Sequence, residues 1–278
     1  MEKNDFKRFC VVIILTLTLH LVTMPVLLYG QKMNVYRILF LVFHNFFAFW
    51  VYFFMILVKK KKGFVEYNEQ TTELLRKEPN KYCILCDNYK PERAHHCSKC
   101  RQCVRKMDHH CMWLGNCVNN DNLGHFIRML LYAVLSLLSL SAFSIYSIVR
   151  RDKFEPMFLF RTILVFIVII AVVSSLLFLA LGFFLIERFI FVLKNLTYLE
   201  SCNLEAFKEN GMLHLVNSPY NLGWSKNLRI QMGKPYFLYM YGEKGDGLSF
   251  EKNFDCEQWP PRQMVERWRQ YNEIPFLP

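Results

Sequence analysis

A short stretch of the chain, residues 106–117, gathers residue types that serve both metal binding and nucleophilic catalysis. It reads KMDHHCMWLGNC and sets Asp108, His109, His110 and Cys111 side by side. Cysteine thiolates and imidazoles are preferred ligands of zinc. The same residues can also supply a nucleophile, a base that activates it and a carboxylate that orients the base. Both chemistries are therefore open to this stretch.

Cysteine and histidine are dense throughout the surrounding segment. Seven of the ten cysteines fall between Cys83 and Cys117, and CxxC steps mixed with histidines are typical of zinc ligation in a reducing compartment. About 60 residues with few large aliphatic side chains cannot build a sufficient core, so bound metal must supply stability. The candidate ligands are Cys83, Cys86, His95, His96, Cys97, Cys100, Cys103, His109, His110, Cys111 and Cys117.

The number of candidate ligands permits one cysteine that binds no metal. Structural zinc takes four ligands, so two Cys3His sites can be completed with Cys111 left out. Side chains alternate between faces in an extended segment, which would put His109 and Cys111 on one face and His110 on the other. His109 could then draw the thiol proton while His110 binds zinc. The alternative is that all candidates are ligands or structural polar residues, as in a membrane-anchored zinc-binding adaptor without catalytic activity.

The composition of the whole chain is that of a membrane protein. Its 278 residues are 53% hydrophobic, and the mean hydropathy is +0.15. The net charge of +11 would suit a nucleic-acid binder, but long apolar runs favour a membrane protein with basic cytosolic segments, and no nucleic-acid partner is expected. Four runs are long enough to span a bilayer, which takes about 20 residues. They are residues 9–29, 38–58, 129–149 and 162–186, the last extending toward 193.

Charge predicts the orientation of these spans. Residues 59–125 hold thirteen lysines and arginines, whereas residues 31–37 hold two, so the positive-inside rule puts residues 59–125 and both termini in the cytosol. We therefore expect a polytopic α-helical membrane protein with four transmembrane helices. A small cytosolic domain with two zinc ions, rich in β-hairpins, would lie between helices 2 and 3. No internal repeat is apparent. The expected parts are residues 1–58, 59–125, 126–193 and a cytosolic tail, 194–278.

The segment from Cys83 to Phe126 resembles the cysteine-rich domain of the DHHC protein S-acyltransferases, also called palmitoyltransferases. The cysteine and histidine spacings fit the family pattern, and so does the layout of four spans with this domain between the second and third. Two motifs depart from it. KKKKGFVEY (59–67) stands where the family usually has Asp-Pro-Gly. TYLE (197–200) stands for Thr-Thr-x-Glu, so Tyr198 puts a ring where a hydrogen bond to the Asp108 region would be expected.

The C-terminal part of the chain carries two further likenesses. SPYNLGWSKNLRIQMG (218–233) resembles the family's C-terminal motif, with Tyr220, Gly223 and Asn227 at matching places. WPPR (259–262) resembles the endoplasmic-reticulum branch of the family in fungi. These likenesses imply an integral multi-pass protein of the endoplasmic reticulum or Golgi membrane.

The resemblance implies a role for each residue of the cysteine-rich segment. Cys111 would carry the acyl group as a thioester, His109 would be its general base, and Asp108 would orient His109. Each of two structural zinc ions would have four ligands. These are Cys83, Cys86, His96 and Cys103 for the first ion, and Cys97, Cys100, His110 and Cys117 for the second.

The implied reaction is a ping-pong transfer of a long-chain acyl group from palmitoyl-CoA to protein cysteine thiols, through the thioester on Cys111. The expected partners are palmitoyl-CoA, membrane-associated protein substrates with cytosolic cysteines, and the lipid bilayer; the sequence does not tell whether an accessory subunit is needed. The anionic CoA needs cations nearby, and the candidates are Lys90, Arg93 and His95.

Overall fold

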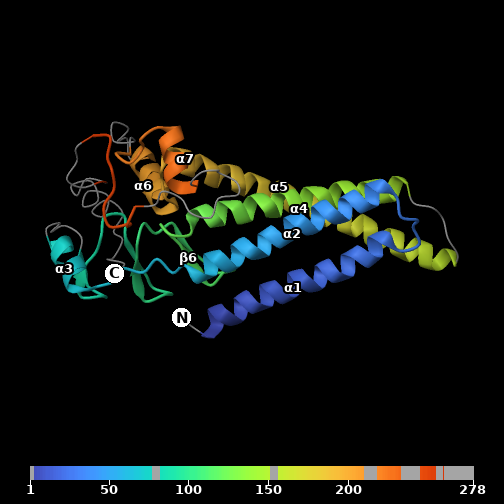
Figure 1. The fold of residues 1–278 in the computed structure, drawn as a ribbon, viewed down its shortest axis with the longest axis horizontal. Coiled ribbons are helices and arrows are strands. Elements are labelled where there is room, and N and C mark those ends of the chain that lie inside the picture. The colour runs from blue at the N-terminus through green and yellow to red at the C-terminus, as the bar shows by residue number, and fades with distance from the viewer. Residues whose placement is uncertain are drawn as a thin grey trace. The chain divides into compact units, whose positions relative to one another are not determined.

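The structure, a computed structural model, describes residues 3–76, 82–150, 156–209, 218–232 and 245–254, and Trp259. These residues form two compact units (Figure 1). One unit comprises residues 3–57 and 125–188, and the other comprises 58–124 with the described residues from 189 onward. The last residue of the 218–233 motif and all of WPPR except Trp259 lie outside the described residues.

Four long apolar helices form most of the first unit. They are α1 (Lys3–Leu28), α2 (Val35–Lys60), α4 (Leu123–Val149) and α5 (Met157–Lys194). Three of them, α2, α4 and α5, extend at one end into residues of the second unit. Each is long and apolar enough to cross a membrane, with mean hydropathies between 1.9 and 3.2, so the four predicted spans are confirmed. A helix suits this environment because it satisfies its backbone hydrogen bonds internally.

Helices α2 and α4 are joined by aromatic and polar contacts within the first unit. The rings of Phe40 and Phe143 stack with centroids 3.9 Å apart. Next to them, His44 Nδ1 lies 2.9 Å from Ser139 Oγ. Polar side chains in an apolar bundle need partners on neighbouring helices, and this pair provides one such link.

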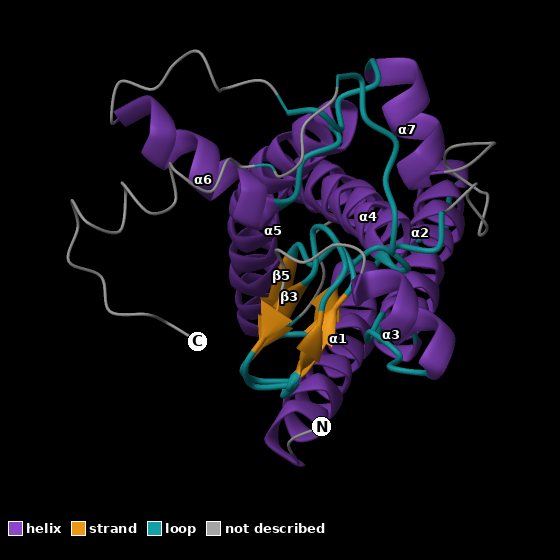
Figure 2. Ribbon diagram, turned by 90° about the vertical axis from the view of Figure 1, so that its left-hand side faces the viewer, coloured by secondary structure: helices purple, strands orange, loops and turns teal. Residues whose placement is uncertain are grey.

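Three short antiparallel hairpins form the centre of the second unit (Figure 2). Strands of two or three residues bury too little apolar surface to be stable alone, so their stability must come from the contacts between hairpins. This arrangement confirms the predicted hairpin-rich domain between the second and third spans. The hairpins pair β1 (Tyr82–Cys83) with β2 (Asn88–Tyr89), β3 (His95–Cys97) with β4 (Gln102–Val104), and β5 (His109–Cys111) with β6 (Asn116–Val118).

The tail belongs to the same unit as the hairpins. It contributes α6 (Tyr198–Glu209) and α7 (Trp224–Met232), while the short helix α3 (Glu69–Arg76) precedes the hairpins. Tyr220 is fully buried in a cluster with Leu196 and Trp259. The sequence-based division at residue 194 set the tail apart, whereas the structure groups it with residues 58–124.

Candidate active site and metal centres

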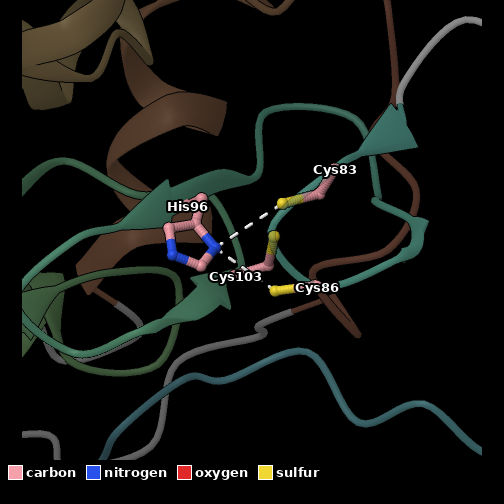
Figure 3. A group of neighbouring side chains, drawn as sticks. All are labelled: Cys83, Cys86, His96 and Cys103. Carbon is pink, nitrogen blue, oxygen red and sulfur yellow. Dashed lines mark hydrogen bonds between the residues drawn. The ribbon is translucent and has the colours of Figure 1, made fainter. Parts of the chain in front are cut away.

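Four side chains from two hairpins converge in the first candidate metal centre (Figure 3). Cys83 and Cys86 come from the β1–β2 hairpin, and His96 and Cys103 come from the next. His96 Nδ1 lies 3.5 Å from Cys83 Sγ and 3.2 Å from Cys86 Sγ. Two ligands of a tetrahedral zinc ion, one sulfur and one nitrogen, would lie about 3.6 Å apart. The geometry therefore fits a zinc ion.

The second candidate centre repeats this arrangement one hairpin further on. Its members are Cys97, Cys100, His110 and Cys117, whose ligand atoms all lie within 4.8 Å of one another. Cys100 Sγ and Cys117 Sγ are 3.6 Å apart, and each is 3.5 Å from His110 Nδ1. The sulfurs are too far apart for a disulfide, at about 2.05 Å, and close to the separation of two thiolates on one zinc ion, about 3.8 Å. Both quartets are those that the resemblance implied.

Cys111 belongs to neither centre and contacts His109 instead. The His109 side chain hydrogen-bonds to Cys111, and His109 Nδ1 lies 2.7 Å from Asp108 Oδ2. Because Nδ1 is engaged by the carboxylate, the contact to the thiol falls to Nε2. His110, on the other face of β5, turns to the second metal centre, as the predicted strand alternation requires.

Electrostatics at this group favour a thiolate beside an imidazolium. Burial opposes charge on His109, but the hydrogen bonds that the ring donates to Asp108 and Cys111 outweigh burial and raise the pKa of His109 to about 9. Burial also opposes ionisation of Cys111, yet His109 and the backbone N–H groups of Leu114 and Trp113 lower the pKa of its thiol. A lowered thiol pKa raises the fraction of the nucleophilic form at neutral pH.

The N-terminus of α6 holds Asp108 in place. The backbone N–H of Tyr198 donates to Asp108 Oδ1 at 2.7 Å. Thr197 and Glu200 form a capping box at this helix end: Thr197 N donates to Glu200 Oε2 at 2.9 Å, and Glu200 N donates to Thr197 Oγ1 at 3.2 Å. Since the donor to Asp108 is main chain, a tyrosine in place of the second threonine leaves the contact intact.

Arg93 ties the capping box to the hairpins. Its Nε lies 2.6 Å from Glu200 Oε1, and both side chains are buried. Burial opposes charge on Glu200, but Arg93 lowers the pKa of this carboxyl. A second guanidinium nitrogen donates to Asn195 O at 2.8 Å. Because protein acceptors already engage Arg93, we keep only Lys90 and His95, both half-buried, as candidate contacts for CoA phosphates.

Asparagine side chains hold the segment that follows α2. Asn116 Nδ2 donates to Lys61 O at 3.2 Å, and Asn119 Nδ2 donates to Lys62 O at 3.0 Å. Both acceptors are main-chain carbonyl oxygens. Every residue type has this oxygen, so the lysines can make these contacts as well as the expected Asp-Pro-Gly residues could. Gly63 has φ +62°, and a Cβ there would lie 2.4 Å from the Asn119 side chain, so glycine is required at this position.

The three hairpins repeat with a period of 14 residues, so the expectation that the chain has no internal repeat is wrong. Cys83, Cys97 and Cys111 are 14 residues apart, and each ends the first strand of a hairpin of the same register. Three residues at equivalent turn positions share a positive φ, namely Asp87 (50°), Arg101 (55°) and Gly115 (54°). The signal was present in the sequence, as the alignment of HHCSKCRQCV (95–104) with HHCMWLGNCV (109–118) shows.

The repeat accounts for the position of Cys111. Each metal centre takes a CxxC pair from one hairpin and a histidine and cysteine from the next. The third hairpin supplies His110 and Cys117 to the second centre, but it has Leu114 where the others have Cys86 and Cys100. Cys111 therefore lacks the second cysteine of a CxxC pair with which it could bind a metal ion.

Sequence reasoning also missed a cation at the turn after Cys111. Lys59 Nζ donates to the carbonyl oxygens of Leu114 and Gly115, at 2.8 Å each. Lys59 is one of four consecutive lysines, and nothing in the sequence distinguishes it from the other three.

Fold and site together define a multi-span membrane protein whose metal-binding hairpins carry a cysteine–histidine–aspartate group outside the metal centres. Residues 76–205 match the model of the DHHC palmitoyltransferase family.

Curated relatives are similar over the central part of the chain. "Probable protein S-acyltransferase 13" of Arabidopsis thaliana is 31% identical over 197 residues, which are 65% of this chain and 61% of the relative. "Palmitoyltransferase ZDHHC2" of Mus musculus is 34% identical over 194 residues, 64% and 49% of the two chains. "Palmitoyltransferase PFA4" of Yarrowia lipolytica is 31% identical over 182 residues, 62% and 53%. The matched part thus spans about half to three-fifths of these relatives' length.

Proposed function

We propose that the chain is a protein S-acyltransferase that moves a long-chain acyl group from acyl-CoA to cysteine thiols of membrane-associated proteins. The observation that carries this proposal is the separation of Cys111 from both metal centres, together with its hydrogen bond to His109. The names of the relatives, palmitoyltransferase and S-acyltransferase, support the same reaction class.

In the first half-reaction, the Cys111 thiolate attacks the thioester carbonyl of acyl-CoA. A carbon–sulfur bond to Cys111 forms, and the carbon–sulfur bond to CoA breaks. The departing CoA thiolate takes its proton from the His109 imidazolium. The hydrogen bond from His109 Nδ1 to Asp108 fixes the ring orientation that keeps Nε2 toward the sulfur.

In the second half-reaction, His109 acts as a base. It takes the proton of a substrate cysteine, whose sulfur attacks the acyl carbon on Cys111. The acyl group leaves on the substrate, and the Cys111 thiolate returns to its contact with protonated His109. The raised pKa of His109 favours the protonated state that pairs with this thiolate.

The metal centres would hold two zinc ions with structural roles. Each ion would supply four bonds that join neighbouring hairpins, and all eight ligands would be protein side chains. We assign Lys90 and His95 to the CoA phosphates. We place residues 59–125 and the termini in the cytosol, since CoA and the basic residues both favour the cytosolic side. We place the spans in the membrane of the endoplasmic reticulum or Golgi.

The test uses the full chain purified in detergent with labelled palmitoyl-CoA. A thioester label, removed by hydroxylamine, should form on the wild type and be absent from Cys111→Ser, while both proteins keep about two zinc ions per chain. Transfer to a cysteine peptide should follow only with the wild type. A folded, zinc-replete wild type without label would contradict the proposal and favour a zinc-binding adaptor.

A further inference from the structure

The third hairpin has the architecture of the two metal-binding hairpins without their second thiolate. We propose that Leu114 keeps Cys111 available as a nucleophile by occupying the place of a second metal thiolate, and that a third soft-metal site is latent there. The part of this inference that concerns catalysis rests on the proposed function. The latent metal site rests only on the hairpin geometry.

Position 114 is equivalent to Cys86 and Cys100 in more than sequence. Cys97 pairs across its hairpin with Gln102, and Cys111 pairs with Asn116 in the same way. In both hairpins a buried cysteine is followed by two exposed residues and then by the position in question. The turns then reach a positive φ at the same step. A side chain at 114 is therefore expected to start from the same backbone geometry as the Cys100 thiolate.

His109 already has the orientation of a metal ligand. Its Nδ1 is held by Asp108 at 2.7 Å, which leaves Nε2 directed to Cys111. Histidines that bind metals commonly donate their other ring N–H to a carboxylate in this way. Cys111, His109 and a thiolate at position 114 would make a three-ligand site with a fourth position open to water.

Leu114 prevents that site with an apolar side chain that is only 3% exposed. Two protein ligands, Cys111 and His109, remain, and a soft cation gains much less from two ligands than from four. Lys59 adds a positive charge at the same turn, through its bonds to the carbonyl oxygens of Leu114 and Gly115. A thiolate that shares its electron pair with a metal is a poorer nucleophile, so this exclusion favours acyl transfer.

The test compares Leu114→Cys with Leu114→Ser, which has a side chain of similar size and no thiolate. Each full-length protein is purified in detergent, exchanged into cadmium and dialysed against a weak chelator, and cadmium per chain is measured by mass spectrometry. We expect about three ions for Leu114→Cys and about two for Leu114→Ser and the wild type, since the two existing centres take one each. Cadmium should also slow alkylation of Cys111 in Leu114→Cys by more than about tenfold.

The double variant Leu114→Cys/Cys111→Ser tests whether the extra cadmium ion needs Cys111 as a ligand. It should return to about two ions per chain. If folded Leu114→Cys holds no more cadmium than Leu114→Ser, the latent site does not exist. If the double variant still holds the extra ion, Cys111 is not its ligand and the inference is overturned.

If Leu114→Cys does not fold, the inference is tested on the wild type instead. Millimolar cadmium should then slow alkylation of wild-type Cys111 reversibly, and His109→Ala should lose most of that protection. Equal protection in both proteins would overturn the inference. None of these measurements needs acyl-CoA, so a wild type that takes no acyl label would remove the proposed function and leave the metal result standing.

Discussion

The β3–β4 and β5–β6 hairpins both begin with His-His-Cys and pair in the same register. In the first of them, Cys97 is joined by Cys100 and by two residues of the hairpin that follows. In the second, Cys111 has Leu114 beside it, and the chain continues into helix α4 rather than a fourth hairpin. The two hairpins thus share one backbone arrangement, but the cysteine of the first belongs to a candidate metal centre and the cysteine of the second does not.

A second difference lies just before each histidine pair. Asp108 precedes His109, whereas Ala94 stands at the equivalent place before His95. Only the third hairpin therefore has a carboxylate beside its first histidine, and only there does the N-terminus of α6 hold that carboxylate. The third hairpin thus differs from the second in two respects: it has Leu114 in place of a metal-ligand cysteine, and it has a carboxylate before its first histidine.

Exchange of each histidine for alanine gives the largest expected contrast. His110→Ala should lower zinc from about two ions to about one per chain and unfold the hairpins, since metal binding supplies their stability. His109→Ala should keep both ions and lose the acyl label. Zinc is measured by mass spectrometry and label by hydroxylamine release. His95→Ala, at the place equivalent to His109, should also retain both zinc ions. Equal zinc loss in His109→Ala and His110→Ala would refute the division of labour between them.

Asp108→Asn tests the acid that the β3–β4 hairpin lacks. Without the carboxylate, the pKa of His109 should fall from about 9 and the pKa of the Cys111 thiol should rise. The thiolate then forms only at higher pH, so label formation at neutral pH should drop by about 100-fold. The pH profile of Cys111 alkylation measures this directly, and its midpoint should move upward. An unmoved midpoint would mean that Asp108 does not act through His109.

Glu200→Gln tests whether the capping box stabilises the unit that holds the third hairpin. The substitution leaves buried Arg93 without its ion-pair partner, and the free energy of unfolding should fall by about 3 kcal/mol. Thr197→Ala removes only the neutral half of the box and should cost about 1 kcal/mol. Thermal unfolding in detergent ranks the two variants. The reverse order would show that the ion pair contributes less than the cap.

Two substitutions at Tyr198 give the smallest and most specific contrast. Tyr198→Thr keeps the backbone N–H, so label formation should change by less than about twofold. Tyr198→Pro removes that N–H at the first helical position, where proline is tolerated. Loss of a hydrogen bond to a charged group, about 1.5 kcal/mol, should slow labelling by about tenfold. Activity that is lost with threonine and kept with proline would show that the side chain matters and the backbone contact does not.

The sequence predicts the parts of this molecule that depend on local pattern. Apolar runs identify the four spans, because a bilayer requires length and apolarity and little else. Strand alternation separates His109 from His110, because adjacent side chains of β5 must point to opposite faces. The membership of each metal quartet came from the family resemblance, since ligand counting alone left several sets possible.

Contacts between distant segments could not be predicted in this way. The Arg93–Glu200 ion pair joins residues 107 positions apart, and no local pattern marks either partner as buried. The sequence therefore predicts Arg93 as a candidate cation for CoA, whereas in the structure it bonds to Glu200 and Asn195. The doubt about Tyr198 had a different origin. A sequence shows side chains, whereas the contact to Asp108 is made by a backbone N–H group.

The interleaving of the metal centres also sets an order of events during synthesis of the chain. The first centre can close once Cys103 has been made, but the second needs Cys117, six residues beyond Cys111. The hairpin that carries Cys111 would thus be the last to have its metal ligands complete. The helix that holds Asp108 comes later still, since α6 begins at Tyr198. On the proposed function, a nascent chain would therefore complete its metal centres in sequence, and the Cys111–His109–Asp108 group only after the last span has been translated.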